Sequence, residues 1–409
     1  MDPLVRWAFS GETAKRIPGT TPHETPPSPI VKRRILQIIP SLDRSGAEKQ
    51  LTLLACGLPR DEFEVHVCAL TRGGPMRDPL RAAEIPVTVI GKRWRVDPRA
   101  YWKLRRHIAR LAPELVHTWL FAANSYGRLA ARACGVRSLV AAERCVDSWK
   151  GGTELSVDRF LARHTARIVV NSPAVRAFYV GRGLPEAKLL VIPNGVAPPP
   201  VAAGNRQQLL AELGLPEGAR LVALVGRLWP QKRVKDAIWA ADLLKVIRDD
   251  VYLLLVGEGP LRERLLRYRD QVQIRDKVRF LGERSDVPRI LPHLAALWST
   301  SSFEGQSNTI MEAMAAGVPV VATDIPGTRD LVEHDRTGYL FPVGDRAALA
   351  RYTQRLLEND ELARRLGGTG RQRMAAQFTV EQMVARHAEL YRELLAERSP
   401  AQTARGTGR

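Results

Sequence analysis

The sequence has few cysteines, no long hydrophobic run and no basic, apolar amino terminus. The four cysteines, Cys56, Cys68, Cys134 and Cys145, form no CxxC pair and show no metal-ligand spacing. That usage is typical of the reducing cytoplasm. No apolar run approaches the roughly 18 residues of a membrane-spanning helix. Because the opening residues MDPLVRWAFS lack the pattern of a cleaved signal peptide, we expect a cytoplasmic protein.

Acidic residues are scarce in the first half of the chain. The 409 residues carry 62 Lys+Arg against 43 Asp+Glu, a net charge of +19. Residues 1–205 hold 31 of these basic residues against 17 acidic ones, and the remainder holds 31 against 26. The length accommodates two ordinary domains. The imbalance indicates that the first domain either faces an anionic partner or has a solubilising surface.

Short apolar segments alternate with helical patterns from about residue 34. Residues 1–33 contain six prolines and little apolar periodicity, which predicts a disordered leader. The strand-like run ILQII at 35–39 is followed by EVHVCAL, ELVHTWL, RSLVAA and RIVVNS, and this first series ends at residue 195. Such alternation predicts an α/β domain over 34–195, with a parallel sheet covered by helices on both faces.

The proline-rich segment VAPPPVAAGNR at 196–206 interrupts this pattern and is typical of a linker. Alternation restarts with LVALVG, which predicts a second α/β domain over 206–378. Two Rossmann-like domains would face each other across a cleft beyond the carboxyl ends of their strands. A helical pattern at about 380–397 could return to the first domain, and residues 398–409 are expected to be a disordered tail.

The stretch SSFEGQSNTIMEAMAAGVPVVATD at 301–324 carries the strongest chemical signal. Its pattern predicts a helix from Ser307, a plausible N-cap, to Ala316, with Gly317 as the stop. The first amides of a helix have no intrahelical partners, and Gly305 just before it permits close approach of a ligand. The segment therefore predicts an anion site suited to a diphosphate.

Two carboxylates and two cations surround that predicted site. Glu304 precedes the helix and Glu312 lies within it, so the two cannot reach the same ligand atoms; such a pair suits the hydroxyls of a sugar and of a ribose. In LVALVGRLWPQKRVKDAIW, Arg227 and Lys232 follow a strand. Cations there would neutralise a diphosphate leaving group as its charge grows. Taken singly, such loop cations are more often merely solvated.

The first domain contributes two candidates to the same cleft. Gly46 opens a helix after the first strand, and His117 ends the strand ELVHTWL. A lone histidine at a strand end is more often structural than catalytic.

At these residues the sequence resembles a known family. EGQSNTIMEAMAAGVPVVATDIPGTRDLV resembles the signature of the family-four retaining glycosyltransferases, and VGRLWPQK resembles their diphosphate-binding element. SGAEKQL resembles their amino-terminal glycine-rich loop, and VIPNGV their interdomain junction. The resemblance covers about residues 35–397 and its elements occur in order, so coincidence is negligible.

The resemblance implies a GT-B fold and transfer of a sugar from a nucleotide-diphosphate donor, expected to be a UDP-sugar, with retention of anomeric configuration. The acceptor would be a glycan or a lipid-linked molecule. No metal or other cofactor is implied, in agreement with the absence of an Asp-x-Asp pair. The implied catalytic residues are His117, near the donor sugar or acceptor, and Glu304, on the donor sugar. The implied donor-binding residues are Gly46, Arg227, Lys232, Gly305, Gln306, Ser307, Asn308 and Glu312, with Glu312 on the ribose.

Three positions depart from the family pattern. Ser45 stands where a first glycine is usual, Arg233 follows Lys232 where glycine is common, and Ala197 stands where aspartate is common. These changes affect loop and hinge geometry rather than the charges of the site. Gln306 is variable in the family, so it is a candidate for selecting the sugar.

Other functions fit the sequence less well. A nucleic-acid-binding protein would need stacking aromatics or a known motif, and neither is present, so no nucleic-acid partner is expected. A glycoside hydrolase needs two carboxylates flanking one bond, whereas a helix separates the tasks of Glu304 and Glu312. A GT-B nucleotide-sugar epimerase is the nearest alternative, because it would use the same donor cleft.

A basic segment could place the protein on a membrane. Residues 92–110 hold eight basic residues and one acid, with the aromatic residues Trp94 and Trp102 among them. An apolar stripe that includes Leu104 and Ile108 predicts a helix packed on the first sheet. The simpler interpretation is an ordinary surface helix. The alternative adds contact of the cations and tryptophans with an anionic bilayer, on the inner face of the cell membrane.

Overall fold

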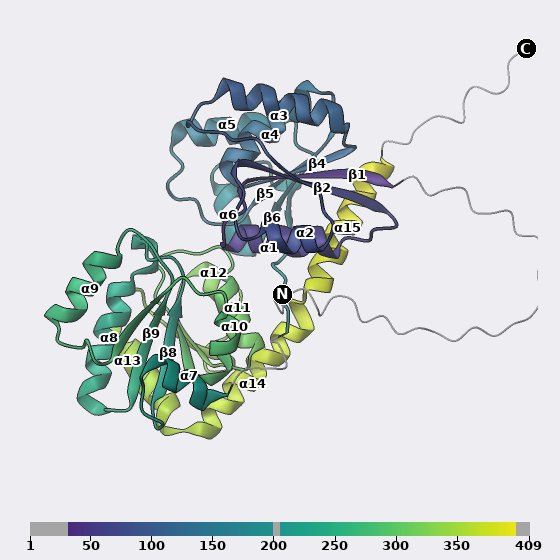
Figure 1. Ribbon diagram of the computed structural model, residues 1–409. Helices are drawn as coiled ribbons and strands as arrows, with labels where there is room; N and C mark the ends of the chain where they lie inside the picture. Colours follow the sequence, from purple (N-terminus) through teal and green to yellow (C-terminus); the bar gives the residue numbers. More distant parts are fainter. Residues whose placement is uncertain (1–31, 199–204, 398–409) are drawn as a thin grey trace, which may run out of the picture.

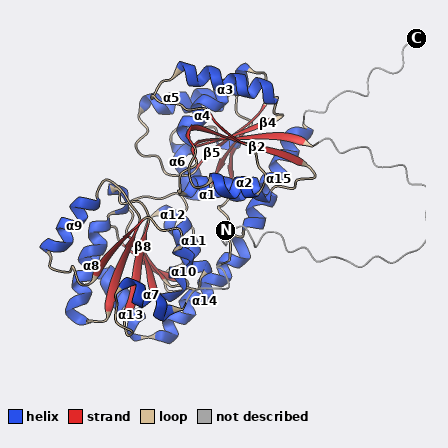
Figure 2. Ribbon diagram, in the orientation of Figure 1, coloured by secondary structure: helices blue, strands red, loops and turns tan. Residues whose placement is uncertain are grey.

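The computed structural model describes residues 32–198 and 205–397 and divides them between two domains (Figure 1). Each domain contains one sheet whose strands all pair in parallel, with seven strands in the first and six in the second. Figure 2 shows helices flanking the strands of both sheets. The predicted fold class, α/β with two Rossmann-like domains, is confirmed.

The sheet of the first domain has the strand order β3-β2-β1-β4-β5-β6-β7. Its central strands are continuous apolar runs because helices cover both of their faces. The strands are β1 (Arg33–Ser41), β2 (Phe63–Arg72), β3 (Val87–Val89), β4 (Leu115–Trp119), β5 (Ser138–Glu143), β6 (Arg167–Val170) and β7 (Leu189–Val191). The helices are α1 (Gly46–Gly57), α2 (Arg77–Ala82), α3 (Pro98–Leu111), α4 (Leu120–Ala133), α5 (Gly152–Ala162) and α6 (Pro173–Gly181).

The second sheet has the order β10-β9-β8-β11-β12-β13. The chain first adds β9 and β10 on one side of β8 and then adds β11, β12 and β13 on the other side, so the order of the strands switches between β8 and β11. Such a switch point is where ligands bind in open parallel sheets. The strands are β8 (Arg220–Val225), β9 (Val251–Val256), β10 (Val278–Gly282), β11 (Leu294–Ser299), β12 (Val320–Thr323) and β13 (Gly338–Phe341). The helices are α7 (Arg206–Leu213), α8 (Val234–Ile247), α9 (Arg262–Gln271), α10 (Val287–Ile290), α11 (Asn308–Ala315), α12 (Pro326–Arg329), α13 (Arg346–Glu358), α14 (Asp360–Gln377) and α15 (Val380–Ala396).

Helix α15 leaves the second domain and packs on the first, beside α1 (Figure 1). Its Tyr391 hydroxyl accepts a hydrogen bond from Gln37 Nε2 in β1 at 2.9 Å, and both residues are buried. Met383 and Leu394 of the same helix belong to the core of the first domain. The last helix therefore completes a core that is otherwise built from residues 35–192.

The two chain passages between the domains lie side by side. The N–H of Val196 donates to the carbonyl of Phe378 at 2.8 Å, and Val196 forms an isolated bridge with Thr379. Gly195 is needed here, because a Cβ would lie 2.7 Å from the Cα of Val380. The predicted linker begins at this contact, and its residues 199–204 lie outside the described residues.

The predicted leader and tail also lie almost entirely outside the described residues, which begin at 32 and end at 397. Within the predicted leader, Arg33 already belongs to β1 and pairs with Phe63 of β2. The strand therefore begins two residues before the apolar run, because β pairing depends on backbone groups and not on side-chain polarity.

Candidate functional site

Helix α11 lies where the sequence predicts it, with the expected start and stop. The side chain of Ser307 caps it by accepting a hydrogen bond from the backbone N–H of Ile310 at 3.5 Å. Gly317 ends it with a φ of 75°, a left-handed conformation that favours glycine. The buried face packs Ile310 into the core of the second domain, while Asn308 and Glu312 contact the first domain. The helix therefore presents its first turn at the boundary between the two domains.

Gly305 is fixed by close backbone contacts. A Cβ at this position would lie 2.2 Å from the carbonyl oxygen of Arg144, which follows β5 in the first domain. The carbonyl oxygen of Gly305 in turn lies 2.2 Å from the place of a Cβ at Gly327. The sequence predicts that Gly305 is a glycine because a ligand approaches it closely. The structure shows a second reason, because the loop after β5 packs directly against Gly305.

Lys232 and Glu304 meet near the carboxyl ends of β8 and β11. Lys232 Nζ forms an ion pair with Glu304 Oε1, which also accepts a hydrogen bond from Ser301 Oγ at 2.7 Å. A small hollow of about 10 Å³, room for about one water molecule, lies at the same place and is lined by Lys232, Ser301 and Ser307. Gly226 lets the lysine approach, because a Cβ there would lie 3.3 Å from Lys232 Cε. This pair offers one cation for a phosphate and one carboxylate for a hydroxyl.

Arg227 follows the end of β8 by two residues and is exposed, with its guanidinium 5.3 Å from the centre of the Trp229 ring. It is also within electrostatic range of Glu48 in α1. Burial raises the pKa of the Glu48 carboxyl, and a hydrogen bond from Ser45 and the charge of Arg227 oppose that shift. The second cation of the predicted diphosphate site therefore faces the first domain across the cleft.

Two departures from the family pattern have clear structural outcomes. Ser45 has a φ of −143°, an extended conformation that any residue adopts, so the serine introduces no backbone strain. Arg233 has a φ of 47°, which is left-handed and unfavourable for residues with a side chain. Its Nε donates to Asp236 Oδ2 at 2.6 Å, which holds the side chain in place.

Helix α1 supplies the opposite wall of the site. The carbonyl oxygen of Gly46 accepts a hydrogen bond from Asn308 Nδ2 at 3.0 Å. Lys49 Nζ lies 2.7 Å from Glu312 Oε1, and Gln50 Nε2 donates to Asn308 Oδ1 at 3.3 Å. The structure thus brings the predicted residues Gly46, Asn308 and Glu312 together.

The interdomain junction contacts the same loop through Asn194. The backbone N–H of Asn194 donates to Gln306 Oε1 at 2.6 Å, and its side-chain Nδ2 donates to Asn308 Oδ1 at 2.6 Å. Gln306 is buried in this arrangement. The sequence predicts Gln306 as a donor contact that selects the sugar, whereas here its side-chain oxygen holds the junction.

His117 is placed differently from the other predicted residues. Its side chain is 0% exposed, and its Nδ1 lies 2.6 Å from the Tyr391 hydroxyl of α15. Burial, with the nearby His387 and Arg144, lowers the pKa of His117 well below its usual value. The sequence predicts that His117 contacts the donor sugar or acceptor, but α15 covers it and the structure does not bring its ring to the cleft surface.

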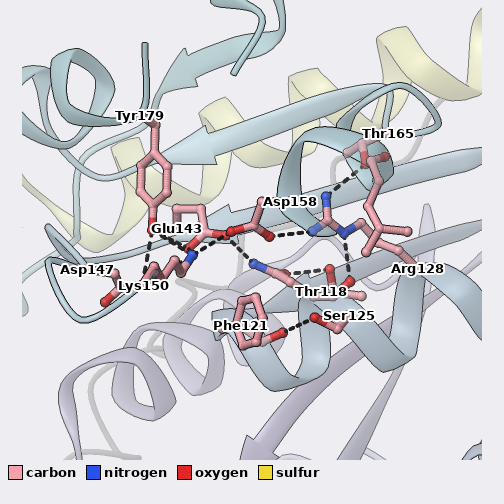
Figure 3. Close-up of polar contacts among 12 residues, drawn as sticks. Thr118, Phe121, Ser125, Arg128, Glu143, Asp147, Lys150, Asp158, Thr165 and Tyr179 are labelled. Carbon is pink, nitrogen blue, oxygen red and sulfur yellow. Dashed lines mark hydrogen bonds and ion pairs between the residues drawn. The ribbon is translucent and has the colours of Figure 1, made fainter. Parts of the chain in front are cut away.

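The loop that rests on Gly305 is anchored by a buried ionic network (Figure 3). Lys150 Nζ lies 3.1 Å from Glu143 Oε2, 2.9 Å from Asp158 Oδ2 and 3.4 Å from Asp147 Oδ2. The Tyr179 hydroxyl accepts from Lys150 at 2.8 Å and donates to the carboxylates of Glu143 and Asp147. The network joins β5, the loop over 144–151, α5 and α6, so it determines where this loop meets the second domain.

Sequence reasoning missed Lys49, Asn194 and Lys150. Lys49 and Asn194 belong to the quoted motifs SGAEKQL and VIPNGV, so the resemblance of these motifs to the family could have indicated them. No sequence pattern around Lys150 indicates its role in the network, because its partners lie at positions from residue 143 to residue 179.

Two family models match this chain, one in each domain. Residues 205–373 match the family described as Glycosyl transferases group 1, and residues 44–198 match Glycosyltransferase Family 4. The protein belongs to this group of glycosyltransferases and is an enzyme of that type.

Its relatives act on several sugars. The chain is 32% identical to N-acetyl-alpha-D-glucosaminyl L-malate synthase of Bacillus anthracis, over 46% of this chain and 50% of that protein. It is 25% identical to UDP-Gal:alpha-D-GlcNAc-diphosphoundecaprenol alpha-1,3-galactosyltransferase of Escherichia coli, over 83% of this chain and 92% of that protein. The matched length is therefore half of the first relative and most of the second.

Solved structures share the fold. HepE of Anabaena in complex with UDP-glucose superposes with a TM-score of 0.79 at 24% identity, over 88% of this chain and 99% of that chain. Sucrose-phosphate synthase of Thermosynechococcus elongatus gives 0.72 at 21% identity, over 90% of this chain and all of that one. The fold is the GT-B fold, as expected from the sequence.

Proposed function

We propose that this glycosyltransferase moves a hexose from a UDP-sugar to a glycan or lipid-linked acceptor, with retention of anomeric configuration. The observation that carries the proposal is the convergence of Lys232, Glu304 and the start of α11 at the switch point of the second sheet. Lys232, Arg227 and the first amides of α11 stabilise the charge that grows on the departing diphosphate. Glu304 binds hydroxyls of the donor sugar, and Glu312 binds the ribose.

The comparisons support this choice of substrates. The Escherichia coli relative is named for UDP-Gal and for a diphosphoundecaprenol acceptor, and a solved relative holds UDP-glucose. A Mycobacterium tuberculosis relative, 28% identical, is named GDP-mannose-dependent, so GDP-mannose is the donor to test against. None of the relatives named here is named as an epimerase, and nothing among them supports the epimerase alternative.

A donor panel tests the function and its independence of metal. We expect sugar release or transfer from a UDP-hexose and little from GDP-mannose, and the same rate in excess chelator, because cations and helix amides take the place of a metal. The described residues hold no group of three or more His, Cys, Asp or Glu side chains suited to a metal ion. With UDP-α-glucose, an α-configured product by NMR supports retention. Activity that is lost in chelator and restored by Mg²⁺ or Mn²⁺ would refute the metal-independent mechanism.

We further propose that the first domain docks on an anionic bilayer through α3 and its neighbours. The predicted helix is α3, which buries Leu104 and Ile108 against the sheet as the sequence indicates. No helix within residues 32–198 and 205–397 has both the length and the apolarity to span a membrane. In this proposal, the enzyme meets an acceptor held in the bilayer at the membrane surface.

Exposed aromatic side chains occur in and beside α3 and α5. Trp94 and Trp102 are each 59% exposed, Trp149 just before α5 is 58% exposed, and Phe160 near the end of α5 is 49% exposed. Arg95 ties the segment before α3 to α5 through an ion pair with Glu154 at 2.7 Å. Indole rings suit the headgroup level, and each basic residue near the surface adds about 1 kcal/mol of attraction.

Sedimentation with vesicles tests this docking. We expect binding to anionic vesicles at low salt, loss of binding at high salt, and none to neutral vesicles. Replacing Lys103, Arg105 and Arg106 with neutral residues should remove most of the binding without lowering activity on a short, water-soluble acceptor. If the protein binds neither anionic nor neutral vesicles, the proposal is wrong and α3 is an ordinary surface helix.

A further inference from the structure

An ion pair crosses the cleft at the predicted ribose contact. Lys49 of α1 and Glu312 of α11 lie 2.7 Å apart, measured from Nζ to Oε1. Their side chains are 30% and 20% exposed, so the pair is partly shielded from water. Partial burial strengthens an ion pair over the surface case, because the dielectric constant around it is lower.

Neighbouring contacts hold the two helices in register at this pair. Asn308, one turn before Glu312, donates to the carbonyl of Gly46 at 3.0 Å and accepts from Gln50. Gln50 also bonds the backbone of Gly195 in both directions, at 2.8 and 2.9 Å. The position of Lys49 relative to Glu312 is therefore set by a rigid, hydrogen-bonded surface.

The ion pair uses only one of the two oxygens of Glu312. Lys49 binds Oε1, and Oε2 has no hydrogen-bond partner among the described residues. A carboxylate held at one oxygen keeps its other oxygen, and the free lone pairs of both, for hydroxyl donors. Two adjacent ribose hydroxyls are donors of that kind.

We propose that Lys49 is a positioning residue for the donor: it fixes the Glu312 carboxylate from the opposite domain in the orientation that binds the ribose. This inference rests on the proposed function, because it assumes a nucleotide donor. It makes nucleotide recognition a joint property of both domains. The arrangement of the two domains then determines the ribose contact as well as the phosphate site.

The inference is tested by measuring how strongly each variant distinguishes UDP from 2′,3′-dideoxy-UDP, using the full chain and calorimetry. Wild-type protein should prefer UDP. Lys49→Met should weaken UDP binding about fivefold to tenfold and leave dideoxy-UDP almost unchanged, because the loss acts through the ribose hydroxyls. Lys49→Arg should restore most of the preference.

A matched control is available in the loop just before α1. Arg44 also pairs across the cleft, with Glu283 at 3.9 Å, but Glu283 lies outside the site. Arg44→Met should keep the wild-type preference for UDP, and thermal melting should show that both methionine variants are folded.

The alternatives give different results. Equal weakening of UDP and dideoxy-UDP in Lys49→Met would assign Lys49 to a phosphate and overturn the inference. Tighter UDP binding would show that the pair competes with the ribose, which also overturns it. An unchanged variant overturns this inference alone, whereas wild-type protein that fails to bind UDP overturns the proposed donor and the inference with it.

Discussion

Replacing Lys232 with alanine should lower the rate of sugar transfer about 10²- to 10³-fold while the protein remains folded. Its ammonium group lies at the carboxyl end of β8, paired with Glu304 and lining the small hollow beside α11. Loss of a preorganised charge at a departing diphosphate costs about 2.7–4 kcal/mol of transition-state stabilisation. The measurement is kcat/KM for transfer from a UDP-hexose, together with a thermal melt of the variant.

A lysine three residues further on provides the control. Lys235 is exposed at the start of α8 and stacks its Nζ 4.3 Å from the centre of the Tyr268 ring. Lys235→Ala removes the same charge from the same segment and should leave kcat/KM within about twofold of wild type. Glu304→Ala should reduce turnover strongly as well, since it removes the carboxylate predicted to contact the donor sugar. Near-normal activity of folded Lys232→Ala protein would refute the site.

Lys150→Met should lower the free energy of unfolding by about 3–5 kcal/mol, the largest stability effect that we expect. Lys150 is fully buried and lies within 3.4 Å of oxygens of Glu143, Asp147 and Asp158. Without it, Arg128 is the one cation among the described residues that still forms an ion pair with these carboxylates, through Asp158. Urea unfolding followed by circular dichroism measures the change.

The decrease in the free energy of unfolding caused by Lys150→Met should depend on pH. Burial raises the pKa of the Asp147 and Asp158 carboxyls, and the charge of Lys150 opposes that rise. Without Lys150 both pKa values rise further, so the folded variant binds more protons than the unfolded chain above about pH 4. Its stability therefore falls as pH increases from there toward neutrality, and the deficit should be smaller at pH 5 than at pH 8. Lys103→Met, at an exposed position, should change stability by less than about 0.5 kcal/mol; a pH-independent deficit would contradict this account.

Features that depend on local sequence were predicted correctly. The start and end of α11 follow from a serine cap and a left-handed glycine, both of which act within a few residues. The alternation of apolar runs and helical patterns was enough to predict two parallel sheets, because buried parallel strands must be apolar on both faces.

Features that depend on contacts between distant segments were missed. The burial of His117 results from α15, which is more than 260 residues later in the chain, so no pattern around residue 117 indicates it. The hydrogen bond of Gln306 Oε1 to the backbone N–H of Asn194 joins residues 112 positions apart, so no local pattern indicates it, and the contact of Gln306 with the donor stays a prediction. The Lys150 network could not be predicted for the same reason. Each of its charged residues, taken alone in the sequence, resembles an ordinary surface charge.

The return of α15 to the first domain bears on how the chain folds as it is synthesised. Met383, Tyr391 and Leu395 complete the core that contains Ile35 and Leu54, so that core lacks one side until the end of the chain has left the ribosome. The second domain has no such dependence, since its core residues lie between 196 and 378. The usual order, in which amino-terminal domains fold first, is therefore reversed: the second domain can fold while the first still exposes the apolar surface that α15 later covers.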